Sequence, residues 1–347
     1  MPEKAKQKPV ALLILAHNES SVIENTVILS KAALSSKDSL FVVADYCTDD
    51  TALKAKNAGA KVLLRNEGSS NSKGAALFWF IEEMGDNLYK FSRTIILDAD
   101  SIITPEFIIN VKKNIIEGNE LMQTFVYPQF DKKSPVGTLA ALSELHDQHI
   151  SDKIRTKLGW TVRLRGTGMV ISPNLLLNLN KNQLETQVED IALSLIFASK
   201  GIKTKRLDTA ILFDPKPSTL ETASRQRARW FRGQQVAIWQ YRKEIMQVFL
   251  KGPAGWSLLG SLFLKPKWLI LLSSLVLSII THSIPLLFFF FALYFTLGIS
   301  YLFLGLCLIP ERRLFFRTLF YIPAYIWMWL KGICLSLSDS SWLRARD

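Results

Sequence analysis

The first hundred residues alternate between short apolar runs and segments with the periodicity of an amphipathic helix. The apolar runs occupy residues 10–16, 40–45, 61–65 and 93–100. Between them, at 20–34, 48–59 and 72–84, apolar residues recur every three or four positions, which is the spacing of one helix face. Strands that alternate with helices at short intervals predict an α/β domain, in which helices cover both faces of a mostly parallel sheet.

The carboxyl ends of these four runs carry polar side chains. His17-Asn18-Glu19 follows the first run, and the others end at Asp45, Arg65 and Asp98–Asp100. Ligands of open parallel sheets bind outside the carboxyl ends of the strands. The sequence therefore predicts a single ligand-binding cleft at this edge. Beyond residue 100 the pattern is less regular, with a predicted strand at 124–130 and a predicted helix at 186–201.

A long uncharged stretch marks the last third of the chain. No Asp, Glu, Lys or Arg occurs from Trp268 to Pro310, roughly twice the length that one helix needs to cross a hydrocarbon core of about 30 Å. Pro285 interrupts the stretch, which predicts a hairpin of two membrane helices at about 267–282 and 285–309. The alternative, a buried pair of soluble helices, is disfavoured because residues 286–295 are apolar on all sides.

Basic residues concentrate beside this stretch. The net charge is +12, and 14 Lys and Arg against four Asp and Glu lie between Lys200 and Trp268. Their place next to an apolar hairpin favours anionic lipid as the partner and not nucleic acid. Basic residues flank the hairpin on both sides, which puts both of its ends on the cytoplasmic face. The apolar run at 10–16 is too short for a signal peptide, so the first 265 or so residues are expected to stay in the cytoplasm.

Composition thus predicts four regions. Residues 1–215 form the α/β domain, and 216–265 form basic, aromatic interfacial helices. Residues 266–310 form the two transmembrane helices. Residues 311–347 hold an interfacial or third membrane helix and a basic C-terminal tail. The three cysteines suggest a reducing compartment, with neither a disulfide framework nor a metal site.

Two acidic pairs and a lysine are candidates for chemistry, and each has a second interpretation. Asp98 and Asp100, at the end of a predicted strand, suit Mg²⁺ or Mn²⁺, which prefer oxygen ligands. Alternatively, Asp100 caps the next helix. Glu189 and Asp190 open a predicted helix, where the helix dipole alone favours acidic side chains. Lys73 begins a helix whose N-terminus suits phosphate, or it is an ordinary surface lysine.

Three further candidates, Gln226, Arg229 and Trp230, lie in the basic aromatic segment. In such segments Arg and Trp commonly contact lipid head groups and have no catalytic role. The lone residues His17 and His146 show no zinc-site spacing. Taken one at a time, none of these signals identifies a reaction.

Seven short motifs follow one another along the first 230 residues. They are "AHNES" (16–20), "VVADYCTDDTA" (42–52), "SKGAAL" (72–77), "LDADS" (97–101), "GTGM" (166–169), "VEDIAL" (188–193) and "QRARW" (226–230). In this order the motifs resemble those of the membrane-bound family 2 glycosyltransferases, which include cellulose, hyaluronan and poly-N-acetylglucosamine synthases. The C-terminal "SSWLRARD" also resembles the tail of many such enzymes. Tyr46-Cys47 and Ala16 depart from the residues that many members have there.

For residues 1–215 the resemblance implies a cytoplasmic catalytic domain with the GT-A fold, a Rossmann-like nucleotide-diphospho-sugar transferase. It implies that Glu19 and Asp45 surround the uridine of a nucleotide-sugar and that Lys73 lies near its base or phosphates. Asp98 would face the nucleotide and, with Asp100, hold the Mg²⁺ or Mn²⁺ that bridges the diphosphate. Carboxylates that await this ion should repel one another, which predicts weak metal binding in the absence of nucleotide.

The same resemblance assigns the remaining candidates to catalysis and to the acceptor. Asp190, beside Glu189 in the Glu-Asp motif, would deprotonate the acceptor hydroxyl. Gln226, Arg229 and Trp230 would hold the diphosphate and the acceptor. Gly168, in "GTGM", is assigned to the acceptor side.

These roles predict an inverting, metal-dependent hexosyltransferase of the cytoplasmic membrane, with its catalytic domain in the cytoplasm. It would transfer a sugar from a nucleotide-sugar to a lipid or membrane-proximal glycan and form a β-linkage. A UDP-sugar is the expected donor. A processive polysaccharide synthase is one alternative, although two helices make a thin wall for a polymer channel. A catalytically silent nucleotide-binding subunit of a synthase complex is the other. Membrane lipids are expected partners, and nucleic acid is not. The sequence leaves open whether the chain forms a homo-oligomer or binds a partner subunit of a synthase.

Overall fold

The computed structural model describes residues 8–68, 72–115, 118–264, 274, 276–308, 316 and 318–338. The chain divides into two compact units. The first comprises the residues up to Tyr127, Arg155–Pro215 and Val236–Leu250. The second comprises Pro128–Ile154, Lys216–Gln235 and the residues from Lys251 onward. Each unit is therefore assembled from segments that lie far apart in the sequence.

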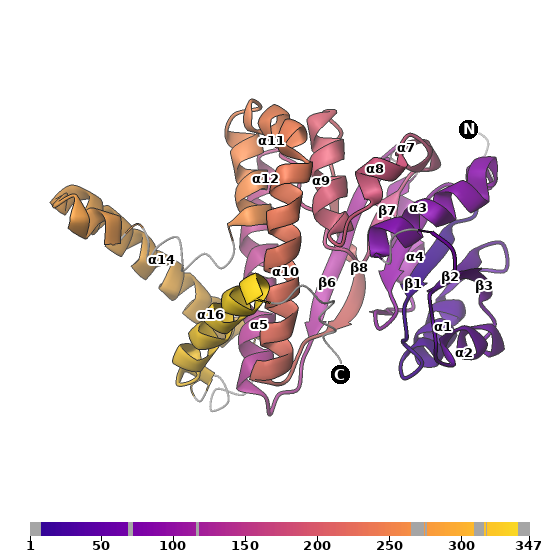
Figure 1. The fold of residues 1–347 in the computed structure, drawn as a ribbon, viewed down its shortest axis with the longest axis horizontal. Helices are drawn as coiled ribbons and strands as arrows, with labels where there is room; N and C mark the ends of the chain where they lie inside the picture. Colours follow the sequence, from indigo (N-terminus) through magenta and orange to yellow (C-terminus); the bar gives the residue numbers. More distant parts are fainter. Residues whose placement is uncertain are drawn as a thin grey trace. The chain divides into compact units, whose positions relative to one another are not determined.

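An eight-stranded sheet forms the centre of the first unit, with the strand order β3-β2-β1-β4-β7-β6-β8-β5 (Figure 1). The strands are β1 (Ala11–Ala16), β2 (Ser39–Asp45), β3 (Lys61–Arg65), β4 (Thr94–Asp98), β5 (Ile102–Ile103), β6 (Leu121–Gln129), β7 (Met169–Ile171) and β8 (Lys205–Pro215). The first four strands along the chain are parallel. β7 runs antiparallel to β4 and β6, and β5 runs antiparallel to β8.

The prediction of a mostly parallel sheet is correct for β1 to β4 and wrong for the sheet as a whole, which is mixed. The change of direction begins at Gly168, whose backbone N–H donates to the carbonyl of Ile96 at 2.8 Å. β7 starts at the next residue and leaves that point against the direction of β4. The antiparallel strands extend the sheet next to the carboxyl end of β4, where the predicted metal ligands lie.

Helices cover both faces of the sheet because its central strands are apolar on both sides. In β1 every residue is buried. Alternate residues of β1, among them Leu12 and Ile14, share one core cluster with α1 (Ile23–Ala33), α2 (Thr51–Asn57) and α4 (Phe107–Ile115). On the opposite face, Phe41 of β2 packs edge-on against Phe80 of α3 (Lys73–Met84), with ring centroids 5.6 Å apart.

Shorter helices complete the first unit. They are η1 (Gly85–Lys90), α6 (Lys153–Lys157, in this unit from Arg155), α7 (Pro173–Leu177), α8 (Lys181–Leu184), α9 (Glu189–Ser199) and α11 (Arg242–Phe249). α9 contacts both α8 and α11. The predicted helix at 186–201 is confirmed as α9, which starts at Glu189 and places the acidic pair in its first turn.

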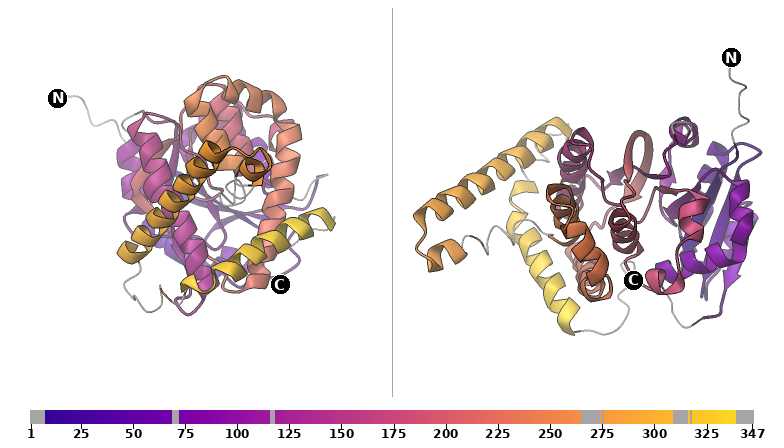
Figure 2. Two further views of the ribbon diagram at one scale, coloured as in Figure 1. Left: turned by 90° about the vertical axis from the view of Figure 1, so that its left-hand side faces the viewer. Right: turned by 90° about the horizontal axis from the view of Figure 1, so that it is seen from above.

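The second unit is mainly helical in its described residues. It contains α5 (Pro135–His146), a single π-helical turn η2 (Asp147–Asp152), α10 (Leu220–Gln240, up to Gln235), α12 (Pro253–Phe263), α14 (Ile284–Leu308) and α16 (Ile322–Ser338). A small apolar core joins α5, α10 and α16 through Val136, Ala223, Met328 and Trp329. α14 and α16 both contact α5, as the two views in Figure 2 show.

Of the predicted membrane hairpin, the second helix is present as α14. Residues Ile284–Cys307 form a helix long and apolar enough to cross a membrane, with a mean hydropathy of 2.1, and this is the one such helix in the described part of the chain. Half of the predicted first helix, residues 267–273 and 275, lies outside the described residues, as does the C-terminal tail 339–347; residues 276–280 are helical. α16 is a shorter apolar helix.

Candidate active site

Three carboxylates meet at the carboxyl end of β4. Asp98 ends β4, Asp100 follows in the next turn, and Asp214 comes from β8. One ligand oxygen from each lies within 4.8 Å of the other two, and all three residues are partly buried. Asp214 is in place because β5 pairs with β8 so that Ile102 faces Phe213. Asp98 and Asp100 were the predicted metal ligands, and Asp214 was not among the residues that the sequence suggested.

The turn that carries Asp98 and Asp100 is fixed by a buried pair of hydroxyls. Thr167 Oγ1 accepts the backbone N–H of Asp98 at 3.2 Å and lies 2.8 Å from Ser101 Oγ. Ser101 and Thr167 are fully or almost fully buried. The helix that follows, α4, begins only at Phe107. Asp100 is therefore not its N-cap, and the capping interpretation of this pair does not hold.

Lys73 connects this cluster to the Glu-Asp motif. Its Nζ pairs with the carboxylate of Asp98 and with Glu189 Oε1 at 2.9 Å, and it donates to the carbonyl of Gly166 at 2.8 Å. Burial alone would lower the pKa of Lys73, but the two carboxylates raise it above its ordinary value. Lys73 is thus a charged ammonium with three acceptors, and it is not an ordinary surface lysine.

The acidic pair at the start of α9 is withdrawn from solvent. Glu189 is 4% exposed and Asp190 is partly buried. Burial raises the pKa of both carboxyls, and for Asp190 the nearby charge of Arg163 opposes that rise. Asp190 Oδ1 also accepts the backbone N–H of Ile191 at 2.8 Å. The alternative of first-turn charges on a solvated helix face does not fit Glu189.

The glycines of "GTGM" serve close packing. Gly166 and Gly168 have φ of +81° and +67°, a backbone region that side chains rarely adopt. A Cβ on Gly168 would collide with Thr124 Oγ1 and lie 2.6 Å from Leu212 Cδ2. These contacts explain why residue 168, at the start of β7, is glycine. Its place on the acceptor side stays a prediction.

A buried ion pair lies at the carboxyl ends of β2 and β3. Arg65 Nη1 donates to Asp45 Oδ1 at 2.5 Å, and both residues are 4% exposed. Burial raises the pKa of Asp45 even though Arg65 opposes the rise. The Arg65 guanidinium also covers the ring of Tyr46 at 5.3 Å. Glu19, at the end of β1, donates its backbone N–H to Thr51 Oγ1 at 2.8 Å.

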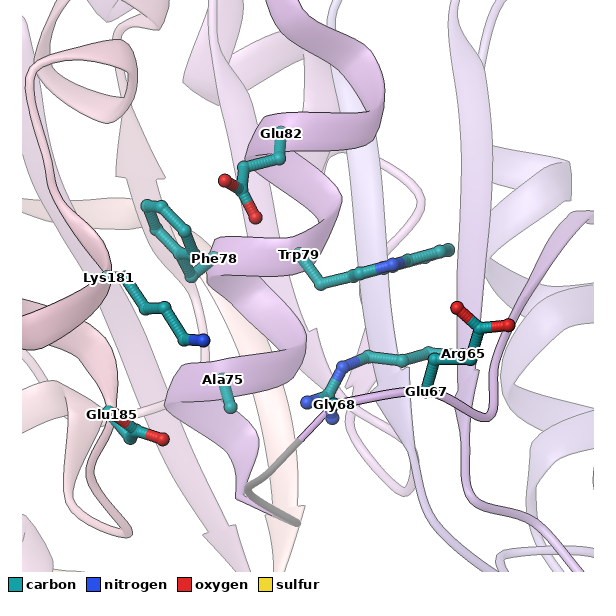
Figure 3. Close-up of a pocket in the computed structure, with 9 residues that line it drawn as sticks. All are labelled: Arg65, Glu67, Gly68, Ala75, Phe78, Trp79, Glu82, Lys181 and Glu185. Carbon is teal, nitrogen blue, oxygen red and sulfur yellow. The ribbon is translucent and has the colours of Figure 1, made fainter.

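A pocket opens beside α3, close to the end of β3 (Figure 3). Figure 3 shows the side chains of Arg65 and Trp79 lying along one side and Lys181 and Glu185 along the other. The lining residues are Arg65, Glu67, Gly68, Ala75, Phe78, Trp79, Glu82, Lys181 and Glu185. None of the three clustered carboxylates lines it.

The structure thus gathers most of the predicted site residues in the first unit: Glu19, Asp45, Lys73, Asp98, Asp100, Gly168, Glu189 and Asp190. Lys73, Asp98 and Glu189 are in direct contact. Gln226, Arg229 and Trp230 lie on α10 in the second unit. The missed residue, Asp214, ends an apolar run, 210–213, in the same way as Asp45 and Asp98. That pattern was the signal that could have identified it.

Residues 7–233 match the family model described as "Glycosyltransferase like family 2". No match was found among the curated proteins. Of the solved structures, the mannosyltransferase PcManGT from Pyrobaculum calidifontis, in complex with GDP-Man and Mn²⁺, is 15% identical, with 97% of this chain and 89% of that chain covered and a TM-score of 0.53. This likeness shows a shared fold, the α/β fold of GT-A type.

Two further solved structures are more distant in shape. Glucosyl-3-phosphoglycerate synthase from Mycobacterium tuberculosis, in complex with Mn²⁺, UDP and glucosyl-3-phosphoglycerate, is 20% identical, with 62% of this chain and 74% of that chain covered and a TM-score of 0.44. A mycobacterial protein is 20% identical, with 60% of this chain and 65% of that chain covered and a TM-score of 0.40. Because the family model spans well over half of its residues, the chain belongs to the glycosyltransferase-like family 2 and is a glycosyltransferase.

Proposed function

We propose that this glycosyltransferase is an inverting, metal-dependent enzyme that works at the cytoplasmic face of a membrane. It transfers a sugar from a nucleotide-sugar to a lipid or a membrane-proximal glycan, and a UDP-sugar is the expected donor. The observation that carries the proposal is the chain of contacts through Lys73, which joins Asp98 of the acidic cluster to Glu189, the neighbour of Asp190. One bridge thereby links a site for a diphosphate to a site for a base.

The acidic cluster suits a divalent ion. Asp98, Asp100 and Asp214 offer three carboxylate oxygens within 4.8 Å of one another, and Mg²⁺ and Mn²⁺ prefer such hard oxygen ligands. We assign these three residues to Mn²⁺ or Mg²⁺, which the mannosyltransferase and synthase structures contain as Mn²⁺. When bound, the ion supplies positive charge that stabilises the leaving diphosphate.

The proposed base is Asp190. The acceptor hydroxyl is a poor nucleophile, so a carboxylate within hydrogen-bond reach has to take its proton as it attacks the anomeric carbon. Burial raises the pKa of Asp190, which makes it a stronger base than an exposed carboxylate. Glu189, which pairs with Lys73 at 2.9 Å, holds the first turn of α9 in place. A single displacement by the hydroxyl inverts the anomeric centre, so an α-linked donor gives a β-linked product.

The remaining roles concern binding. Glu19 and Asp45, at the carboxyl ends of β1 and β2, are assigned to the nucleoside. Arg229 of α10 is assigned to the diphosphate, where its charge stabilises the leaving group, and Gln226 and Trp230 to the diphosphate and the acceptor. Residues Ile284–Cys307 are assigned to a membrane span, because this helix is long and apolar enough.

The experiment is turnover of a donor panel by the purified full-length chain in detergent. UDP-sugars and GDP-mannose are supplied with Mn²⁺, with Mg²⁺ or with EDTA, and released nucleoside diphosphate is measured. Asp190→Asn should abolish turnover and leave the melting temperature unchanged, whereas Asp86→Asn, at an exposed position of η1, should keep wild-type turnover. Full activity of Asp190→Asn would show that the base has been misassigned. Turnover that is equal with EDTA and with Mn²⁺ would exclude the metal.

A further inference from the structure

Arg227 lies one residue after Gln226, at a position that the Gln-x-x-Arg-Trp pattern leaves open. Its side chain is deeply buried, since the residue is only 3% exposed. Within the described part of the chain no carboxylate pairs with it, and its Nε has no hydrogen-bond partner. A buried cation without a counter-charge is costly to maintain, so what surrounds this guanidinium needs an explanation.

Two indole rings enclose the guanidinium. The Arg227 Cζ lies 5.0 Å from the ring centroid of Trp230 and 5.2 Å from that of Trp329, both within the range of cation–π attraction. Nη1 donates to Gln226 Oε1 at 2.8 Å, and Nη2 lies 3.5 Å from the hydroxyl of Tyr325. A single side chain therefore contacts two residues of the motif and two residues of α16.

The rest of the interface shows that α16 rests directly on this part of α10. A Cβ on Gly332 would lie 2.8 Å from Arg227 Cβ and 3.2 Å from the carbonyl oxygen of Ser224. A Cβ contact of 2.8 Å is essentially never found in real structures, and the atom it meets belongs to the fixed base of the Arg227 side chain, so any larger residue at 332 would displace α16 or α10. Phe231 packs edge-on against Trp329, with ring centroids 5.7 Å apart. α16 is thus closely fitted to α10 at the place where Arg227 is buried.

We propose that Arg227 is a positioning residue that holds Gln226 and Trp230 in their working conformations, and that α16 takes part in the transferase site through it. The inference rests on the proposed function, which assigns Gln226 and Trp230 to the diphosphate and the acceptor. The chemistry favours arginine, because its planar guanidinium lies over two indole rings while it donates to Gln226. A lysine ammonium is a point charge that has no plane to stack.

The test measures binding of a nucleoside diphosphate to the full-length chain in detergent, with MnCl₂ present. The probe is UDP or GDP, whichever binds the wild type more tightly, and the readout is the calorimetric Kd. Arg227→Lys should weaken binding about tenfold or more, because misplaced contacts are costly. Arg225→Lys is the matched control, since Arg225 pairs with Glu221 on the same helix. The control should leave the Kd unchanged.

A second set of variants leaves Arg227 intact and changes α16 instead. Gly332→Ala should raise the Kd as Arg227→Lys does, because the added Cβ pushes α16 away from Arg227. Gly298→Ala is its control, since a Cβ there meets nothing within 4 Å. Trp329→Phe keeps an aromatic face for the guanidinium and should retain binding, whereas Trp329→Ala should lose it.

The experiment distinguishes failure of the positioning role of Arg227 from failure of the role proposed for Gln226 and Trp230. The positioning role is overturned if Trp230→Ala raises the Kd while Arg227→Lys, Gly332→Ala and Trp329→Ala leave it unchanged. It is also overturned if Arg227→Lys lowers the melting temperature and leaves the Kd at the wild-type value, because Arg227 is then structural only. If Trp230→Ala itself has no effect, or if neither nucleotide binds, the proposed role of the motif fails instead.

Discussion

Gly74→Ala is the substitution whose effect the structure defines most sharply. Gly74 lies in the first turn of α3, next to Lys73. A Cβ at this position would lie 2.8 Å from the carbonyl oxygen of Thr186 and would collide with that of Leu184. Both obstacles are backbone atoms, so no side chain can rotate away to relieve them. The start of α3 has to move away from the 184–186 segment.

The size of this movement sets the size of the effect. Ordinary contact of a Cβ begins at 3.4 Å, so relief against Thr186 alone takes 0.6 Å, and relief against Leu184 takes more. Overpacking of this kind costs about 1–3 kcal/mol of folding free energy. The bonds of Lys73 to Glu189 and Gly166, at 2.9 and 2.8 Å, then lengthen towards or past 3.5 Å, where hydrogen bonds fail. Misplacement by about 1 Å typically costs a factor of ~10² in rate.

The assay combines donor turnover with a thermal melt of the full-length chain in detergent. Gly74→Ala should lower turnover by about two orders of magnitude and lower the melting temperature measurably. Gly260→Ala makes the same chemical change within α12, where the nearest contact, at 3.7 Å from Leu264 Cδ1, is ordinary. This control should leave both readouts near wild type. Wild-type turnover and melting by Gly74→Ala would refute the close approach of α3 to the 184–186 segment.

Three further predictions concern charge. Burial raises the pKa of Asp190, and the base works only when it is deprotonated. Turnover should therefore fall on acidification at a higher pH than it would with an ordinary carboxyl, whose pKa is about 4. Arg163→Gln removes a charge that opposes the rise, so it should shift the acidic limb of the pH–rate profile to a still higher pH. Arg65→Met leaves the Asp45 carboxylate buried without its partner and should cost about 3–5 kcal/mol at neutral pH. The loss in melting temperature should shrink at low pH, where Asp45 is protonated, and also in the double variant with Asp45→Asn. Asp214→Asn should weaken calorimetric Mn²⁺ binding in the presence of UDP, whereas Asp208→Asn, an exposed position on the same strand, should not.

Hydrophobic periodicity was sufficient to predict the parallel half of the sheet. The apolar runs at 10–16, 40–45, 61–65 and 93–100 correspond to β1, β2, β3 and β4. These strands are buried on both faces, which produces continuous apolar runs that local pattern detects. β7 is only three residues long and follows a glycine-rich turn, so its own sequence carries almost no strand signal. The mixed character of the sheet was missed for that reason.

The site was predictable only where its residues follow one another along the chain. Asp98 and Asp100 share one turn, and Glu189 and Asp190 share another, so motifs identified both pairs. Asp214 enters the cluster through the pairing of β5 with β8, which joins residues more than a hundred positions apart. Long-range pairing of this kind leaves no local periodicity. The partners of Lys73 are hidden for the same reason, since they come from β4, α9 and the loop at Gly166.

Lys73 also changes how the carboxylates behave before any ligand arrives. From the sequence alone, Asp98 and Asp100 are expected to repel one another and to bind a metal weakly without nucleotide. In the structure the ammonium of Lys73 already pairs with both Asp98 and Glu189, so the repulsion between Asp98 and Asp100 is partly relieved while one oxygen of Asp98 is engaged. The ion therefore has to compete with a fixed positive charge at Asp98. A nucleoside diphosphate brings phosphate oxygens that attract both the ion and Lys73, and this shared attraction favours the arrival of metal and donor together.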